Sequence, residues 1–162
     1  MSERLRKQLG KQVAAGLAQN ATSPISDERS GPEAQKSAWL PRLASGEVRG
    51  GLALTEPDAG TDLQGIRMTA KADGNGYVIN GTKTWISNGI EGSCFALLVK
   101  TDPAAEPRYK GMSMFIAPKQ AGFTVGRKLE KLGYKSIDSG ELIFEDYRLT
   151  ADHLIGGGEG QG

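Results

Sequence analysis

The stretch Tyr77-Val78-Ile79-Asn80-Gly81-Thr82-Lys83-Thr84-Trp85-Ile86-Ser87 decides the fold class of this chain. Residues that favour strands, mostly β-branched or aromatic, lie on both sides of Asn80-Gly81. Asn-Gly is the strongest short hairpin signal, because both residues tolerate the positive φ angles of a type I′ turn. The stretch therefore predicts two strands, Tyr77–Ile79 and Thr82–Ser87, joined by a tight turn.

Further strand-like segments lie on both sides of this hairpin, from residue 50 to about residue 148. Glycine, proline or aspartate separates them, and they cover residues 50–55, 66–72, 95–100, 112–117, 123–129 and 141–145. Glycine supplies 23 of the 162 residues, against an average usage of about 7%, which indicates many tight turns. Seven or eight short strands of this kind predict a mainly β fold, as a small antiparallel β-barrel or sandwich.

One or two α-helices are expected before the strands. Residues 3–17 carry an apolar residue at every fourth position, which predicts an amphipathic helix. Its narrow apolar side has no aromatic anchor, so a packed helix with a solvated basic face is favoured over a membrane-bound one. Ser30 and Glu33 have the spacing of a capping box for a second helix, which should include Trp39 as a core residue and end by Gly46.

Composition excludes several classes of function. The net charge of +1 disfavours a polyanionic partner such as nucleic acid. One histidine, His153, and one cysteine, Cys94, cannot supply the usual His and Cys ligands of a zinc site. His153 lies in a polar tail with no evident neighbour, which disfavours Ser-His-Asp and Cys-His catalysis. We expect Cys94 to be buried, because an apolar run follows it, and His153 to lie on the surface. The chain lacks a secretory signal and any run of about 20 apolar residues, so a soluble cytoplasmic protein is expected.

Two short constellations carry polar and aromatic groups that suit a ligand. Strand alternation places Lys83, Trp85 and Ser87 on one face of their strand, and an indole beside a hydroxyl suits a planar heteroaromatic ligand. In the corner Thr55–Thr61, Gly60 removes bulk so that backbone amides can approach an anion, beside two threonine hydroxyls. Each constellation also has an ordinary interpretation, as core packing in the first case and as a simple turn in the second.

Taken together, the two constellations closely resemble the middle domain of the acyl-CoA dehydrogenase family. The resemblance rests on Leu54-Thr55-Glu56-Pro57-Asp58-Ala59-Gly60-Thr61-Asp62 and Asn80-Gly81-Thr82-Lys83-Thr84-Trp85-Ile86-Ser87-Asn88-Gly89. It extends upstream over 31–36 and 39–47 and downstream over 132–136 and 144–147, and it covers about residues 18–162. Lys135 stands where relatives often have arginine. The implied division is a helical N-terminal remnant over 1–49, a flavin-binding β-barrel over 50–150 and a Gly-rich exit segment over 151–162.

The resemblance implies a flavoprotein that binds FAD. By position, Trp85 would lie against the isoalloxazine, and Ser87, where many relatives have threonine, would hydrogen-bond near flavin N5. Gly60 and Thr61 would approach the pyrophosphate, and Thr61 would also border the acyl-CoA site. The full set of cofactor-binding residues that the resemblance implies is Leu52, Leu54, Thr55, Gly60, Thr61, Trp85, Ile86 and Ser87.

The implied reaction is α,β-dehydrogenation of an acyl-CoA thioester in fatty acid metabolism, with electron-transfer flavoprotein as a partner. The family's base is a glutamate of a C-terminal helical domain, so we expect this chain to be a fragment that is inactive alone and needs helical domains or other subunits. Glu56 is expected to have a structural role in its Glu-Pro corner rather than to replace that base. Two alternatives remain open at this point: a noncatalytic β-barrel interaction module and an acyl-CoA oxidase fragment.

Overall fold

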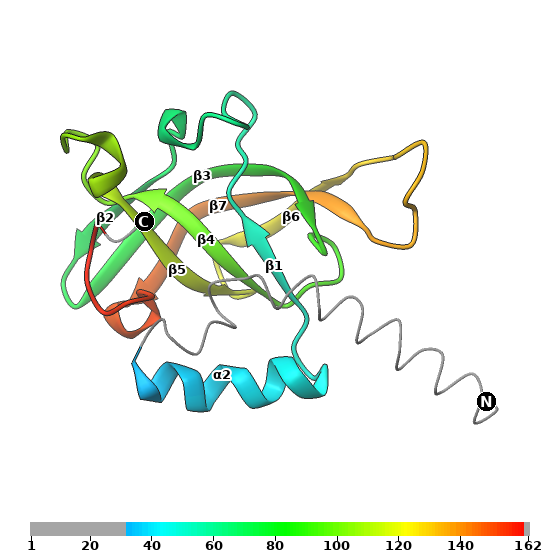
Figure 1. The fold of residues 1–162 in the computed structure, drawn as a ribbon, viewed down its shortest axis with the longest axis horizontal. Coiled ribbons are helices and arrows are strands. Elements are labelled where there is room, and N and C mark those ends of the chain that lie inside the picture. Colours follow the sequence, from blue (N-terminus) through cyan, green and yellow to red (C-terminus); the bar gives the residue numbers. More distant parts are fainter. Residues whose placement is uncertain (1–31, 161–162) are drawn as a thin grey trace.

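The computed structural model describes residues 32–160, which form one helix beside a curled sheet (Figure 1). The predicted helix over 3–17 and the capping residue Ser30 lie outside these described residues. The helix is α2 (Glu33–Ser45), and three short 3-10 helices are η2 (Leu63–Gly65), η3 (Arg108–Gly111) and η4 (Ala151–His153). The strands are β1 (Gly50–Ala53), β2 (Thr69–Asp73), β3 (Gly76–Ser87), β4 (Cys94–Lys100), β5 (Met112–Pro118), β6 (Phe123–Lys128) and β7 (Ser139–Thr150).

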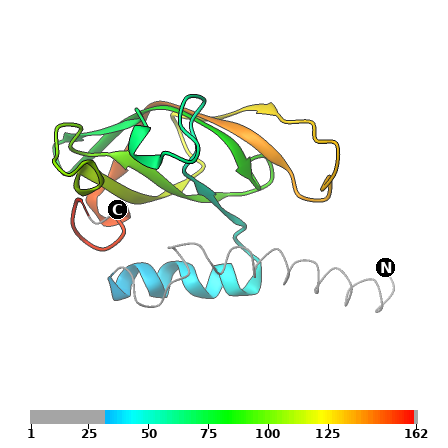
Figure 2. The ribbon, with the colours of Figure 1, turned by 45° about the horizontal axis from the view of Figure 1, so that its top comes forward.

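All seven strands belong to one sheet that curls into a half-barrel, so the predicted mainly β fold is confirmed (Figures 1 and 2). The strand order is β1-β4-β2-β3-β7-β6, and β5 pairs with the other edge of β4. Most neighbours are antiparallel, but β1 runs parallel to β4, and Thr69 of β2 makes a single parallel pair with Lys100. The strand pattern did not predict these parallel pairs, because period-two alternation carries no information about strand direction.

The predicted hairpin turn at Asn80-Gly81 is wrong. Both residues lie inside β3, and the turn that joins β2 to β3 is Gly74-Asn75, where Gly74 has φ of 59°. Asn80 instead serves a β-bulge in β7, since its Oδ1 accepts a hydrogen bond of 2.8 Å from the amide of Asp146. Gly81 has φ of 144°, and a Cβ there would lie 2.8 Å from Cγ of Met68. The permissive backbone of Gly81 therefore serves a bulge and a close contact rather than a turn.

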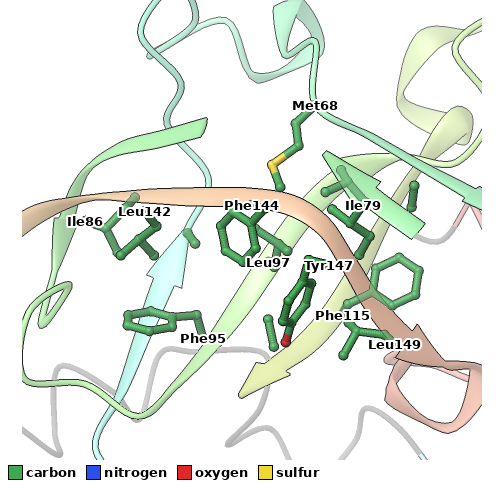
Figure 3. Close-up of a cluster of buried hydrophobic side chains, with 14 of the residues drawn as sticks. Met68, Ile79, Ile86, Phe95, Leu97, Phe115, Leu142, Phe144, Tyr147 and Leu149 are labelled. Carbon is green, nitrogen blue, oxygen red and sulfur yellow. The ribbon is translucent and has the colours of Figure 1, made fainter. Parts of the chain in front are cut away.

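The core lies inside the half-barrel, where apolar side chains from six strands meet. Figure 3 shows Phe144 and Tyr147 of β7 beside Leu97 of β4, with Phe95 and Ile86 at one end. Tyr147 is fully buried and donates its hydroxyl to the carbonyl of Pro118 over 2.7 Å. The phenol oxygen thus has a partner, without which its burial would be costly.

Strand β4 is buried on both of its faces, which explains its uninterrupted apolar sequence. Phe95 and Leu97 face the core, whereas Cys94 and Ala96 face a second cluster that includes Leu43 of α2. Cys94 is buried as predicted, and burial raises the pKa of its thiol to about 12. A strand covered on both faces has no solvent side on which polar residues are required.

Helix α2 forms a separate layer against this second cluster (Figure 2). It begins after Pro32, passes through Pro41 without a break, and ends at Gly46, which adopts a left-handed φ of 78°. Trp39 is partly buried against the cluster, in line with its predicted core role. Nε2 of Gln35 donates to the carbonyl of Leu154 over 2.9 Å, so the helix is tied to the segment that follows β7.

Candidate functional site

A bulge near the end of β3 turns Trp85 outwards. Lys83 pairs with Leu142 and Ile86 with Gly140, so Thr84 and Trp85 together oppose the single residue Glu141 on β7. Trp85 has φ of 57°, and 60% of its surface is exposed. A bulky side chain in this left-handed region is a rare and strained arrangement, and such strain concentrates at functional sites. The indole is therefore displayed outside the core rather than packed within it.

Strand β1 runs beside the end of β3 at this point. A Cβ at Gly51 would lie 2.6 Å from the carbonyl oxygen of Ser87, so only glycine allows the two backbones to come this close. The amide of Thr84 donates to the carbonyl of Thr55 over 2.9 Å, and Nδ2 of Asn88 donates to the carbonyl of Gly50 over 2.8 Å. The structure thus brings the segment 50–55 next to the segment 84–88.

The chain then folds back on itself in the corner that follows β1. The amide of Glu56 donates to the carbonyl of Ala59 over 2.9 Å, and the amide of Ala59 donates back over 3.2 Å. Gly60 and Thr61 follow on the exposed rim of this corner, and a Cβ at Gly60 would meet no atom within 4 Å. Hydrogen bonds connect this rim to the strand of Trp85 indirectly, through Thr55 and Glu56.

The predicted site residues differ in what they present to solvent. Leu52, Trp85 and Ser87 are exposed, as are Gly60 and Thr61, whereas Leu54 and Thr55 are half-buried. Ile86 is buried in the core, so its side chain cannot contact a ligand outside the half-barrel and only its backbone remains available. The assignment of these residues to a ligand stays a prediction.

Lys83 does not lie on the face of Trp85 and Ser87, which corrects the alternation argument. Its side chain is 0% exposed, and its ammonium lies 2.8 Å from Oε1 of Glu56. The bulge causes the difference, because the extra residue shifts the alternation between Lys83 and Trp85. Burial lowers the pKa of Lys83, and the hydrogen bond and charge of Glu56 oppose that shift. The sequence held no signal for this ion pair, because strand alternation alone cannot locate a bulge.

Neither a metal-binding cluster nor a membrane-spanning helix is found in the described part of the chain. Within residues 32–160, no group of three or more His, Cys, Asp or Glu side chains could hold a metal ion. His153 is half-buried, and its Nδ1 lies 3.0 Å from the hydroxyl of Thr150. No helix in this same part is long and apolar enough to cross a membrane.

Two substitutions of Trp85 should separate its backbone strain from its ring. Trp85→Ala and Trp85→Gly both remove the indole, but only glycine adopts φ of 57° without strain, so the glycine variant should be more stable by about 1 kcal/mol. Urea unfolding followed by circular dichroism measures the difference. At the exposed Thr124 of β6, the same pair should show the reverse order, because glycine weakens a regular strand. An alanine variant at position 85 that equals the glycine variant would contradict the strained backbone.

The comparisons with known proteins agree with this arrangement. A family model described as "Acyl-CoA dehydrogenase, middle domain" matches residues 51–147. The chain is 42% identical over 147 residues to mitochondrial isovaleryl-CoA dehydrogenase of Pongo abelii, and the match covers 88% of this chain and 35% of that relative. The chain therefore spans about a third of the length of the curated relatives it matches.

Two solved structures show the same fold. Acyl-CoA dehydrogenase from Geobacillus kaustophilus superimposes with a TM-score of 0.82 at 43% identity, over 87% of this chain and 37% of that one. Glutaryl-CoA dehydrogenase from Mycobacterium smegmatis, solved in complex with FADH2, gives a TM-score of 0.71 at 36% identity, over 81% of this chain and 32% of that one. The chain belongs to the acyl-CoA dehydrogenase family, and its residues 51–147 are the middle domain of that family.

Proposed function

We propose that this chain supplies part of the FAD site of an acyl-CoA dehydrogenase. The observation that carries the proposal is the exposed Trp85, held outwards by a strained bulge beside the exposed Ser87. An exposed indole on a strained backbone contributes little to the core, and it offers a flat surface for a planar ring. The family membership and the FADH2 complex of the Mycobacterium smegmatis relative support this assignment.

The residues present fit a flavin in their chemistry. Trp85 and Leu52 provide apolar surface, and Ser87 and Thr55 provide hydroxyls that can donate or accept. Within residues 32–160, the hydroxyls of Ser87, Thr55 and Thr61 make no hydrogen bond, so they remain available to a ligand. Gly60 leaves its surroundings open, which suits the close approach of a phosphate group to backbone amides.

The proposed reaction is the α,β-dehydrogenation of an acyl-CoA thioester. FAD, when bound, would accept the hydride that leaves the β carbon. Trp85 would orient the flavin ring, Ser87 would hydrogen-bond near flavin N5, and Thr61 would border the substrate. The hydrogen bond from Ser87 would help to hold the charge that develops on the ring.

Glu56 is not proposed as the base of this reaction. Its carboxylate is buried, and it accepts hydrogen bonds from Lys83 and from the amides of Arg67 and Met68. A base must reach the proton that it removes, and this carboxylate faces the interior. We propose that a carboxylate from outside residues 32–160, in a helical domain or another subunit, completes the site.

Several finer parts of the proposal rest on the family alone. They are the acyl-CoA substrate, electron-transfer flavoprotein as electron acceptor, and the division into a helical segment over 1–49, a flavin domain over 50–150 and an exit segment over 151–162. The cytoplasmic location expected from the sequence stays a prediction. An oxidase would use the same flavin surface and differ in oxygen access, so the test below addresses the flavin first.

Titration of FAD into the full chain tests the proposal. We expect quenched flavin fluorescence and a shifted visible absorption band, and Trp85→Ala should weaken binding about tenfold because the ring contact is lost. Tyr109→Ala is the matched control, since Tyr109 is also an exposed aromatic residue but lies in η3. An unshifted flavin spectrum would refute the proposal and favour a noncatalytic interaction module. Bound FAD that acyl-CoA does not reduce would show binding without catalysis.

A further inference from the structure

The corner after β1 contains a buried ion pair that the proposed flavin contacts do not use. Nζ of Lys83 lies 2.8 Å from Oε1 of Glu56 and donates to the carbonyl of Leu54 over 2.9 Å. The same carboxylate accepts the amide of Arg67 over 2.6 Å and the amide of Met68 over 3.1 Å. Lys83 is 0% exposed and Glu56 7%. Both charges are therefore enclosed and have several partners each.

Stability alone is a weak reason for such a pair. Enclosing two charges removes them from water, and well-packed apolar side chains of similar volume often stabilise a core as well or better. A buried pair is better understood through what it holds in place, because its geometry tolerates little displacement.

The pair connects the two halves of the candidate site. Lys83 stands immediately before the bulge that displays Trp85, and its ammonium holds the carbonyl of Leu54. The amide of the next residue, Thr84, donates a hydrogen bond to the next carbonyl, that of Thr55. Two consecutive residues of β3 thus donate hydrogen bonds to two consecutive carbonyls after β1, those of Leu54 and Thr55. Glu56 extends this hydrogen-bond network to the backbone before β2, because its carboxylate accepts the amides of residues 67 and 68.

We propose that Lys83 and Glu56 are positioning residues that hold the corner bearing Leu54 and Thr55 against the bulge bearing Trp85, and so set the affinity for FAD. This inference rests on the proposed flavin function. Neither side chain is placed to contact a ligand on the exposed surface, because both are buried. The pair acts by preorganisation, since a surface that is already in its bound geometry loses less free energy on binding.

The decisive variant is Lys83→Met combined with Glu56→Gln. It removes both charges together, keeps the volumes similar, and leaves a side-chain amide oxygen at position 56 that can still accept the backbone amides of Arg67 and Met68. The hydrogen bonds from Lys83 to the carbonyl of Leu54 and to Glu56 are lost. With the amide oxygen in the place of Oε2, the amide of Arg67 keeps its acceptor, and the amide of Met68 keeps the longer of its two contacts, of 3.3 Å. We expect FAD binding to weaken about tenfold in this variant, with an altered visible absorption band at saturating FAD. The measurements are made at a temperature at which circular dichroism shows the variant to be folded.

The matched control is Leu149→Ala, a buried substitution in β7 opposite Tyr77 and remote from the corner. It should lower stability without changing FAD affinity. If the double variant binds FAD with wild-type affinity and an unchanged spectrum, the pair has no positioning role. If both variants lose affinity in proportion to stability, its role is only structural, and the proposal is equally overturned.

Amide hydrogen exchange tests, without any flavin, whether the pair holds the corner against β3. The Thr84 amide, which bonds Thr55, should exchange about tenfold faster in the double variant relative to the Leu97 amide of β4 in the same sample. Global destabilisation accelerates both amides, so their ratio isolates the corner. An unchanged ratio would overturn the proposal. A wild-type chain that binds no FAD would refute the proposed function and, with it, the claim about affinity. A changed exchange ratio would even then show that the pair holds the corner against β3.

Discussion

Glu56→Gln alone is expected to lower the free energy of unfolding by about 3–5 kcal/mol at pH 7, because it leaves the ammonium of Lys83 buried without its carboxylate. Within residues 32–160, Glu56 is the one ionisable side chain that pairs with Lys83. The neighbouring charges, Asp58 and Arg67, pair with each other at the surface over 3.4 Å. No other charged side chain of the described corner is therefore placed to compensate.

The loss should shrink as the pH rises towards 10. Burial already lowers the pKa of Lys83 below its ordinary 10.5, and removal of Glu56 takes away the interactions that oppose this shift. Between the lowered pKa and 10.5, the unfolded chain binds more protons than the folded chain, so the free energy of unfolding rises with pH. The effect should be larger in the variant than in the wild type, because the pKa of its lysine is lowered further.

Urea unfolding at pH 7 and pH 10 measures this difference, with each variant compared with the wild type at the same pH. The comparison removes the titration of tyrosines and other lysines that both proteins share. Asp58→Asn is the matched control, because its ion pair is exposed and should change stability by less than about 1 kcal/mol at either pH. A pH-independent loss in Glu56→Gln would show that the stranded ammonium is not its cause.

The second large effect is expected in the core. Phe144→Ala should lower the free energy of unfolding by about 3–5 kcal/mol, through lost burial and the cavity that remains. Phe144 is 1% exposed, and its ring meets Phe123 at 4.9 Å and Tyr147 at 5.2 Å between centroids. It stands where β7 pairs with both β3 and β6, so few neighbours can move to fill the space (Figure 3).

Urea unfolding followed by far-UV circular dichroism also measures this loss. Leu132→Ala is the matched control, because Leu132 is fully exposed in the connection between β6 and β7 and should change stability by less than about 0.5 kcal/mol. Equal effects at the two positions would mean that the ring of Phe144 does not pack as described.

Stability and proposed function compete at Trp85. The strained backbone there destabilises the fold by an amount of the order of 1–3 kcal/mol. The buried pair beside it encloses two charges that an apolar core does not need. The strained backbone is unfavourable and the enclosed pair is a weak source of stability, yet both lie at the segment that displays the indole. Their coincidence is expected where structure has been retained for binding rather than for stability.

Local sequence patterns determined much of this protein. Strand-forming segments separated by turn residues predicted the mainly β fold, and the apolar run after Cys94 predicted its buried strand. The motifs around Thr55 and Trp85 identified the family that the comparisons show. These features follow from short-range preferences and burial, which depend on residues adjacent in the chain.

Tertiary structure alone decided where strand regularity breaks. Asn80-Gly81 has the chemistry of a turn, yet it lies within β3 because β7 supplies a bulge whose amide Asn80 can satisfy. Lys83 follows the alternation of Trp85 and Ser87 in sequence, yet a second bulge sends it inwards to Glu56, 27 residues earlier. A bulge is stabilised by the partner strand and by contacts remote in sequence, so no local pattern reveals it.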